Sequence, residues 1–170
     1  MRRVYLLLLF WGIAMAAGFK IYSPAFDFGA PIPSRYTCDG ADVSPPLVFE
    51  HVPANAASLV LAVLDPDAPG GTFVHWVAYD LPPGLKGLPE GVPKRPLVDG
   101  FKQALNDFGF AGYGGPCPPR GHGPHRYFFT LYALDVPGLG LAPGAPAREV
   151  LAATKGHVLA EATWMGVYQR

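Results

Sequence analysis

The sequence has little charge, and neither sign prevails. Lys and Arg number 13, Asp and Glu also number 13, and charged residues make up 15% of the 170 positions. No basic stripe of the kind that binds nucleic acid is present. No predicted helix is both basic and amphipathic, as membrane-surface helices are. We therefore expect no nucleic-acid partner, and any anion must be bound by a local site.

Long hydrophobic runs are absent except at the start of the chain. There, the run Val4–Met15 follows two arginines and precedes small residues, which is the order of a secretory signal peptide. We predict a signal peptide over residues 1–17, cleaved after Ala16 or Ala17, and one domain over residues 18–170. The run is short for a membrane span, so an uncleaved anchor is the weaker alternative. We expect an exported protein, periplasmic or extracellular, without stable membrane insertion after cleavage.

Cysteine is scarce: the sequence contains only Cys38 and Cys117. Both lie among Gly, Pro and Asp residues, which predict loops. In an exported protein, two cysteines indicate one disulfide. This disulfide would close a loop of about 80 residues and contribute roughly 4 kcal/mol in the chain-entropy model. The alternative is a pair of buried free thiols.

Glycine and proline, by contrast, are abundant, with 21 and 20 residues. They lie between apolar runs without a fixed period, which predicts many turns joining short strands. The expected strands are Phe19–Ser23, Leu47–Glu50, Ser58–Leu64, Phe73–Leu81, Lys102–Asn106, Arg126–Asp135 and Val158–Gln169. The fold class that follows is all-β with a minor helix, arranged as an antiparallel β-sandwich.

The segments between these strands complete the expected organisation. A short helix is predicted over Pro146–Lys155, because Pro is favoured at a helix start and Gly156 stands just past the end. Leu81–Gly100 and Gly109–Gly123 are expected to be long loops. Simple alternation along one strand would place Phe73, His75, Val77 and Tyr79 on one face.

Polar side chains gather at the ends of three predicted strands. Asp65 follows the strand Ser58–Leu64, His75 lies near the start of the next strand, and His125 immediately precedes Arg126. If the first strand runs antiparallel to the other two, all three side chains reach the same edge of the sandwich. Tyr127 shares the parity of His125 and would project on the same side. Each residue alone has an ordinary structural explanation, but together they predict a pocket.

Two pairs of motifs carry a resemblance to a known family. They are Asp65-Pro-Asp-Ala-Pro69 with His75-Trp76, and Gly115-Pro-Cys-Pro-Pro119 with Gly123-Pro-His125-Arg-Tyr127. In order and spacing they closely resemble the signature segments of the phosphatidylethanolamine-binding (Raf-kinase-inhibitor-like) family. Cys38-Asp-Gly and Ser44-Pro-Pro46 look like its bacterial and archaeal branch. The resemblance covers residues 19–169.

The resemblance implies a β-sandwich with a small pocket that takes phosphate, acetate or phospholipid head groups. The pocket residues that it implies are Asp65, His75, Pro119, His125 and Tyr127. Asp67 and the backbone of Gly112–Gly115 would support them. Phe73 stands where eukaryotic members tend to have Trp, and the chain ends in a predicted strand instead of the long C-terminal helix of the animal proteins.

The chemistry of these residues suits a weak, selective anion site. Imidazole N–H groups, the Tyr127 hydroxyl and glycine-loop amides would be the hydrogen-bond donors. Asp65 would orient a histidine, or accept the ammonium group of an ethanolamine head group. A carboxylate beside His75 and His125 should favour their protonated forms. Anion binding would then strengthen as the pH falls through the histidine range.

Two chemical alternatives, a zinc site and a hydrolase, compete with a binding pocket. Asp65, His75, His122 and His125 have the chemistry of zinc ligands, but their spacing matches no established zinc motif. A hydrolase is disfavoured because no Gly-x-Ser-x-Gly motif occurs and no serine has a visible partner base.

We therefore expect no catalytic residue, no metal and no cofactor, but non-enzymatic binding of a small anion or a phosphate-bearing head group. The alternative function is an exported protein-interaction module, similar to a protease or kinase inhibitor. The segment Leu81–Gly100 would then contact the protein target.

Overall fold

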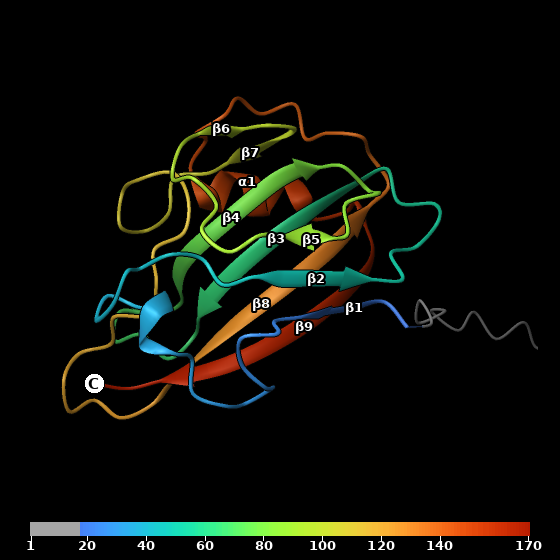
Figure 1. The fold of residues 1–170 in the computed structure, drawn as a ribbon. Coiled ribbons are helices and arrows are strands. Elements are labelled where there is room, and N and C mark those ends of the chain that lie inside the picture. The colour runs from blue at the N-terminus through green and yellow to red at the C-terminus, as the bar shows by residue number, and fades with distance from the viewer. Residues whose placement is uncertain (1–17) are drawn as a thin grey trace, which may run out of the picture.

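Two antiparallel sheets pack face to face in the computed structural model, which describes residues 18–170 (Figure 1). The larger sheet has the strand order β6-β7-β4-β3-β8-β9, and the smaller has the order β1-β2-β5. The strands are β1 (Lys20–Tyr22), β2 (Leu47–Glu50), β3 (Ser58–Asp65), β4 (Phe73–Leu81), β5 (Gly87–Leu88), β6 (Leu97–Val98), β7 (Phe101–Gln103), β8 (His125–Leu134) and β9 (Val158–Tyr168). The predicted antiparallel sandwich is confirmed. The predicted signal peptide, residues 1–17, lies outside the described residues.

The central strand β3 shows why the sandwich forms. Its sequence SLVLAVLD is apolar almost throughout, because both of its faces are covered. Leu59, Leu61 and Val63 pack into the core between the two sheets. Val60 and Ala62 belong to a second core on the other side of the large sheet. Burying each large apolar side chain contributes roughly 1.5–3 kcal/mol, so β3 anchors both layers.

The second core is covered by the helix α1 (Ala147–Thr154), which confirms the short helix predicted over Pro146–Lys155. Pro146 stands at the N-cap, and Gly156, just beyond the C-cap, has a φ of 84°. Glycine adopts this left-handed conformation without the steric cost that a side chain would add. Val150 on the inner face of the helix is fully buried. Within residues 18–170, no helix has the length and hydrophobicity needed to cross a membrane.

A bulge in β4 breaks the simple alternation of that strand. Val63 pairs with Trp76, and the next residue, Leu64, pairs with Val74, so His75 is an extra residue without a partner on β3. Bulges of this kind redirect a side chain. Trp76 therefore faces the core between the sheets, whereas Val74 faces the helix side.

The prediction that Phe73, His75, Val77 and Tyr79 share one face is therefore wrong. Val77 and Tyr79 pack into the core beneath α1, whereas Phe73 and His75 line a pocket at the edge of the sandwich. The extra residue in β4 explains the difference, because it shifts the parity of every residue that follows it.

Two further expectations need correction. The segment Leu81–Gly100 is not a plain loop, since it contains the two-residue strands β5 and β6. The strand expected over Lys102–Asn106 is β7, Phe101–Gln103. β5 pairs with β2, β7 pairs with β4, and β6 pairs with β7. Strands this short show too few residues for a sequence pattern.

Candidate functional site

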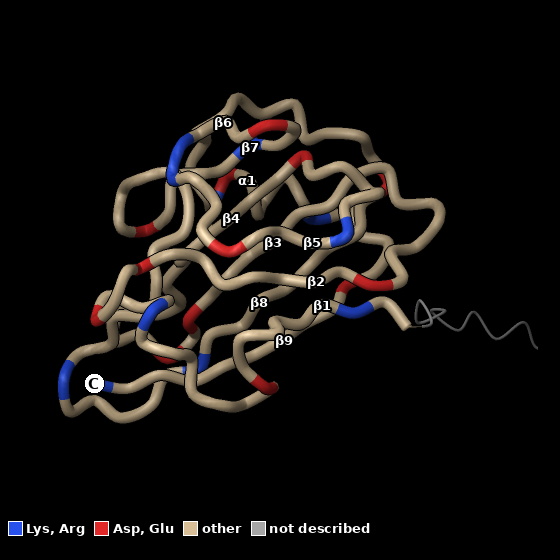
Figure 2. Tube along the Cα trace, in the orientation of Figure 1, with Lys and Arg blue, Asp and Glu red and all other residues tan. Residues whose placement is uncertain are grey.

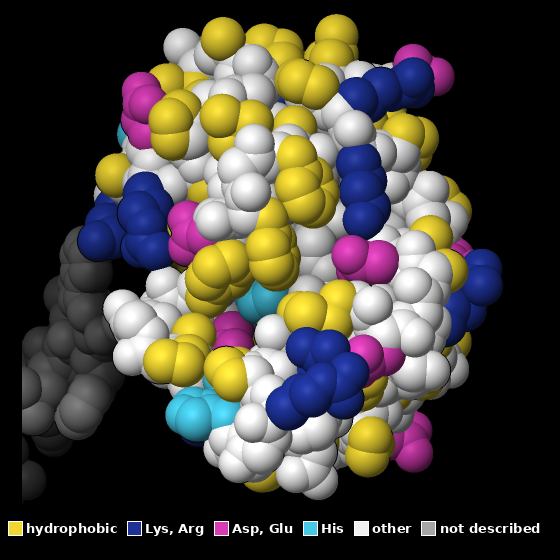
Figure 3. Space-filling model, turned by 90° about the vertical axis from the view of Figure 1, so that its left-hand side faces the viewer, with side chains coloured by type: hydrophobic (Ala, Val, Ile, Leu, Met, Phe, Trp, Pro, Cys, Tyr) yellow, Lys and Arg dark blue, Asp and Glu magenta, His cyan; other side chains and the backbone are white. Residues whose placement is uncertain are grey.

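The predicted convergence of strand ends is present in the structure. β3 runs antiparallel to both β4 and β8, so its C-terminal end meets the N-terminal ends of the other two. There the chain forms a pocket of about 210 Å³. Figure 3 shows a hollow on this side with hydrophobic side chains around it and histidine and acidic side chains within it. The pocket is lined by Asp65, Ala68, Pro69, Phe73, His75, Phe108, Cys117, Pro118, Pro119, His125 and Tyr127.

All five residues predicted as ligand-binding are therefore brought together: Asp65, His75, Pro119, His125 and Tyr127. Their role in binding stays a prediction, but their convergence is a feature of the structure.

A buried carboxylate–imidazole pair forms one side of the pocket. Asp65 Oδ2 accepts a hydrogen bond from His125 Nδ1 at 2.7 Å, and the two side chains are 4% and 2% exposed. Asp65 Oδ1 accepts the backbone N–H of Asp67 at 2.7 Å, which fixes the carboxylate. Because His125 Nδ1 donates to Asp65, the tautomer and the orientation of the ring are set.

His75 contributes a second buried imidazole. Its Nδ1 donates to the carbonyl oxygen of Gly114 at 2.7 Å, so that a neutral ring carries no proton on Nε2. Burial lowers the pKa of His75, and the Gly114 carbonyl and the charge of Asp65 only partly oppose this effect. The expected stabilisation of protonated His75 is therefore wrong, because the cost of burying the charged ring outweighs the nearby carboxylate.

Tyr127 places a buried hydroxyl in the same pocket. The residue is 1% exposed, and its hydroxyl has no hydrogen-bond partner among the described residues. Burial raises the pKa of Tyr127, and the charge and closeness of the Asp65 carboxylate, which the hydroxyl faces without a hydrogen bond of normal geometry, add to this effect. The hydroxyl therefore stays protonated and can donate. A buried polar group left unpaired costs about 1–3 kcal/mol. This unpartnered donor is the feature of the pocket that most directly indicates an acceptor from outside the chain.

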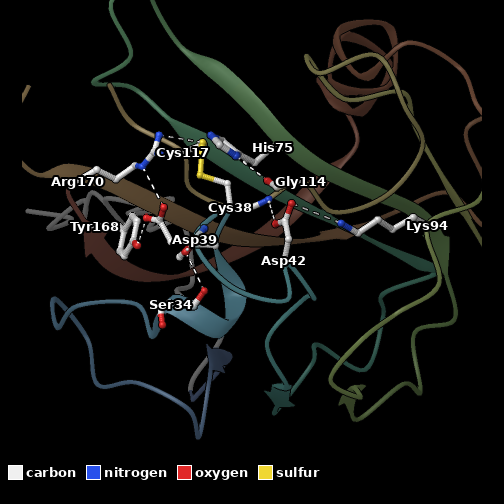
Figure 4. The surroundings of a disulfide bond; sticks show 12 residues. Ser34, Cys38, Asp39, Asp42, His75, Lys94, Gly114, Cys117, Tyr168 and Arg170 are labelled. Carbon is white, nitrogen blue, oxygen red and sulfur yellow. Dashed lines mark hydrogen bonds and ion pairs between the residues drawn. A yellow bond between two sulfur atoms is a disulfide. The ribbon is translucent and has the colours of Figure 1, made fainter. Parts of the chain in front are cut away.

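Residues 112–119, here called the wall segment, form the opposite side of the pocket and are tightly held (Figure 4). The predicted disulfide between Cys38 and Cys117 is present. Beside it, the Cys38 N–H donates to the carbonyl of Pro116 at 3.1 Å. The Gly115 N–H donates to Asp42 Oδ1 at 2.8 Å.

Further bonds tie the wall segment to other parts of the chain. The Gly114 N–H donates to the carbonyl of His75 at 3.0 Å. The Tyr113 hydroxyl donates to the carbonyl of Tyr36 at 2.6 Å. Several distant segments thus hold the wall segment in place. The expected support from the backbone of Gly112–Gly115 is thus visible in the contacts of His75.

An aromatic rim borders the pocket. Phe73 lies against Phe108, with ring centroids 4.7 Å apart, and Phe108 is 45% exposed. Phe108 also meets the ring of His75 edge-on at 5.4 Å. The sequence did not indicate Phe108, because an aromatic residue in a glycine-rich loop gives no periodic pattern. Cys117 and Pro118 also line the pocket without having been predicted to do so, although they lie within a recognised motif.

His122 extends the pair of Asp65 and His125, because it lies beside the ring nitrogen of His125 that does not contact Asp65. Its Nδ1 lies 2.6 Å from His125 Nε2. Among residues 18–170, no group of three or more His, Cys, Asp and Glu residues is arranged to hold a metal ion. The zinc ligands considered above therefore do not form such a group among these residues.

A larger hollow lies elsewhere, between β1 and β9. It measures about 550 Å³ and is lined mainly by aromatic and aliphatic groups, with Tyr22, Glu50 and Trp164 among them. None of the predicted site residues reaches it. The Tyr22 hydroxyl and Glu50 are bonded to each other at 3.3 Å, so the groove offers no unpartnered buried group. Chemistry, rather than size, favours the smaller pocket.

The fold and the pocket together define a class: β-sandwich proteins with a small pocket, mainly apolar with a few buried polar groups, where strand ends meet. A family model described as phosphatidylethanolamine-binding protein matches residues 22–169. The chain belongs to the phosphatidylethanolamine-binding protein family.

Relatives and solved structures agree with this assignment. A UPF0098 protein of Aquifex aeolicus is 53% identical over 151 residues, covering 89% of this chain and 88% of the relative. The crystal structure of Escherichia coli YbcL, described as a member of the mammalian family, has a TM-score of 0.85 and 31% identity, covering 91% of this chain and 99% of YbcL. A homologue from Chlamydia trachomatis has a TM-score of 0.80 and 42% identity, covering 89% and 97%.

Proposed function

We propose that this protein binds a small anion, such as phosphate, acetate or a phosphate-bearing head group, in the pocket of Asp65, His75, Pro119, His125 and Tyr127. The observation that carries the proposal is the buried Tyr127 hydroxyl, a donor without a partner among the described residues. An anionic oxygen beside it would accept this hydrogen bond and remove the cost of leaving the donor unpaired.

The charge distribution supports recognition by local groups. Within residues 18–170, acidic and basic residues are interspersed without a basic cluster (Figure 2). The residues that line the pocket include no Lys or Arg. Selectivity must then come from hydrogen-bond geometry, and we expect modest affinity. Asp65 repels an anion, so its role is to orient His125 and to carry the counter-charge when that ring is protonated.

The lining also favours binding over catalysis. It contains no Ser, Thr or free thiol, because Cys117 is bonded to Cys38. The Tyr127 hydroxyl is a poor nucleophile, since burial and the charge of Asp65 raise its pKa. We therefore propose binding without chemical conversion of the ligand.

We also propose that the protein acts outside the cytoplasm. The disulfide supports this, because both of its cysteines are exposed residues and exposed disulfides persist in oxidising compartments.

His75 predicts how binding depends on pH. With Nδ1 donating to Gly114, the Nε2 atom of neutral His75 can only accept a hydrogen bond. One proton must then lie between Nε2 and an anion oxygen. It can come from a protonated ring or from the ligand itself. The protonated ring and the protonated ligand are both more populated at low pH, so anion binding should be tighter at about pH 6 than at about pH 8.

The experiment is an NMR titration of residues 18–170 with phosphate and, separately, with acetate at both pH values. Acetate is fully ionised at both, so its pH dependence reports the protein alone. We expect saturable shifts around Asp65, His75 and His125 that are lost in His75→Ala and His125→Ala. The matched control is Tyr22→Phe in the larger groove, which should bind normally. Absence of a response to both phosphate and acetate, and to phosphoethanolamine in a third titration, would contradict the proposal and favour the protein-interaction alternative.

A further inference from the structure

We propose that His122 is a positioning residue that links the buried pair of Asp65 and His125 to solvent and couples anion binding to proton uptake. This inference rests on the proposed function, since it concerns how the same pocket accepts an anion. It goes beyond that function because His122 does not line the pocket and acts through His125.

The three side chains form one hydrogen-bonded chain. His125 Nδ1 lies 2.7 Å from Asp65 Oδ2, and His125 Nε2 lies 2.6 Å from His122 Nδ1. The two imidazole rings meet edge-on, with centroids 4.9 Å apart. Since His125 donates from Nδ1, the Nε2 of the neutral ring is an acceptor, and His122 must be the donor. Both nitrogen atoms of His125 are thus used by the chain.

Burial changes sharply along this series of three hydrogen-bonded side chains. Asp65 and His125 are buried, whereas His122 is exposed. His122 lies between Gly121 and Gly123, which have φ values of 78° and 87° and no neighbouring atom where a side chain would begin. The local backbone thus leaves room for the ring to turn. His122 is the member of the chain through which a proton can reach the buried pair.

The other ionisable groups near Asp65, His125 and His122 are not the site of proton uptake. From the adjoining elements they are Asp67, Arg126, Tyr127, Tyr168 and Arg170.

Each of these groups keeps its charge state near neutral pH. Asp67 forms an ion pair with Arg126 at 2.8 Å, and Arg170 forms one with Asp39 at 3.3 Å. The pKa values of Tyr127 and Tyr168 are raised, that of Tyr127 chiefly by burial and that of Tyr168 chiefly by its hydrogen bond to Asp39.

The consequence is an electrostatic switch at the buried pair of Asp65 and His125. While both histidines are neutral, an anion in the pocket meets the charge of Asp65. When the pair takes up one proton, the charge of Asp65 is balanced and the repulsion falls. Loss of His122 should alter the proton uptake without removing any atom that contacts the ligand.

Two substitutions separate this role from a merely structural one. In His122→Asn, the side-chain amide can still donate to His125 Nε2, but it does not titrate. In His122→Ala, water replaces the ring, and His125 remains free to take up a proton. The Asn variant should therefore preserve the hydrogen bond and lose the coupling, whereas the Ala variant should lose the hydrogen bond and keep part of the coupling.

The first measurement uses the ligand-free protein. Imidazole ¹⁵N spectra at about pH 8 report the hydrogen bonding of His125 Nε2. We expect the Nε2 resonance to move in His122→Ala and to stay near its wild-type position in His122→Asn. An Nε2 resonance that is identical in the wild type and His122→Ala would overturn the proposed chain, whatever the pocket binds.

The second measurement compares acetate affinity at about pH 6 and about pH 8. The wild type should bind roughly tenfold more tightly at the lower pH, and His122→Asn about twofold or less. A wild-type ratio in His122→Asn would overturn the coupling role. Failure of the wild type to bind either acetate or phosphate would instead overturn the proposed function and with it the coupling. The ligand-free spectra would still decide whether the hydrogen-bonded chain exists.

Discussion

Two consecutive stretches of chain border the pocket in opposite ways. The wall segment, residues 112–119, is tied by a disulfide and by hydrogen bonds to Tyr36, Asp42 and His75. The next stretch, residues 120–124, here called the histidine loop, is mostly exposed and carries two glycines with positive φ. The contrast indicates a division of labour: the wall segment keeps the shape of the pocket, and the histidine loop connects its charge to solvent.

The disulfide provides the largest expected difference between the two stretches. Replacing both Cys38 and Cys117 with Ser should lower the free energy of unfolding by about 4 kcal/mol, because it frees a loop of about 80 residues in the unfolded chain. It should also weaken phosphate binding, since Cys117 lines the pocket. Chemical denaturation and a phosphate titration measure the two effects.

Reduction of the wild type by dithiothreitol is the matched comparison for this variant. It should reproduce the loss of stability, whereas the double Ser variant should be insensitive to reductant. A reduced wild-type protein with unchanged stability and unchanged binding would show that the wall segment does not need its covalent link.

A pair of glycine substitutions sharpens the comparison. An added Cβ at Gly115 would overlap the carbonyl oxygen of Tyr36 and the carboxylate of Asp42, so Gly115→Ala should destabilise by about 3 kcal/mol. An added Cβ at Gly121 meets open space, and Gly121→Ala should cost only about 1 kcal/mol, from its positive φ. Thermal unfolding of both variants tests the difference. Equal losses would refute the contrast in packing.

A smaller effect concerns the ion pair between Asp67 and Arg126, just beyond the histidine loop. Asp67 accepts hydrogen bonds from the backbone N–H and the guanidinium of Arg126, both at 2.9 Å. These contacts, the guanidinium first, lower the pKa of Asp67 to about 2. The stabilisation is therefore complete above about pH 4, the unfolded value, and is lost as the pH falls toward 2.

The expected effect is small, because Arg126 is largely exposed and solvent screens its charge. Arg126→Gln should show a shallower loss of thermal stability between about pH 4 and pH 2 than the wild type. Parallel curves for the two proteins would mean that this ion pair does not contribute to stability.

Much of the architecture could be predicted because its signals are local. The apolar run of β3 and the aromatic alternation of β8 indicated the central strands, and their antiparallel order brought Asp65, His75 and His125 to one edge. The short strands β5 and β6 were missed because two residues are too few to give a periodic pattern, and β5 also depends on β2, a partner distant in sequence. The bulge at His75 was missed because one inserted residue leaves no periodic signal.

The sequence predicted which residues form the candidate site, but not how burial changes the pKa of His75. The motifs indicated which side chains line the pocket. The lowered pKa of His75 depends on how deeply neighbouring segments bury the ring, and that burial is not visible in local sequence. Phe108 and the contact of His122 with His125 were missed for the same reason, since each depends on how a glycine-rich loop folds back onto the strand ends.

The most direct test of the account is a calorimetric phosphate titration of Tyr127→Phe beside the wild type. The substitution keeps the ring and removes only the buried hydroxyl that lacks a partner among the described residues. We predict equal or slightly higher stability to unfolding and a loss of phosphate affinity of roughly tenfold, the value of one hydrogen bond to a charged group. Wild-type affinity in Tyr127→Phe would contradict the claim that this hydroxyl, and the pocket around it, binds an anion.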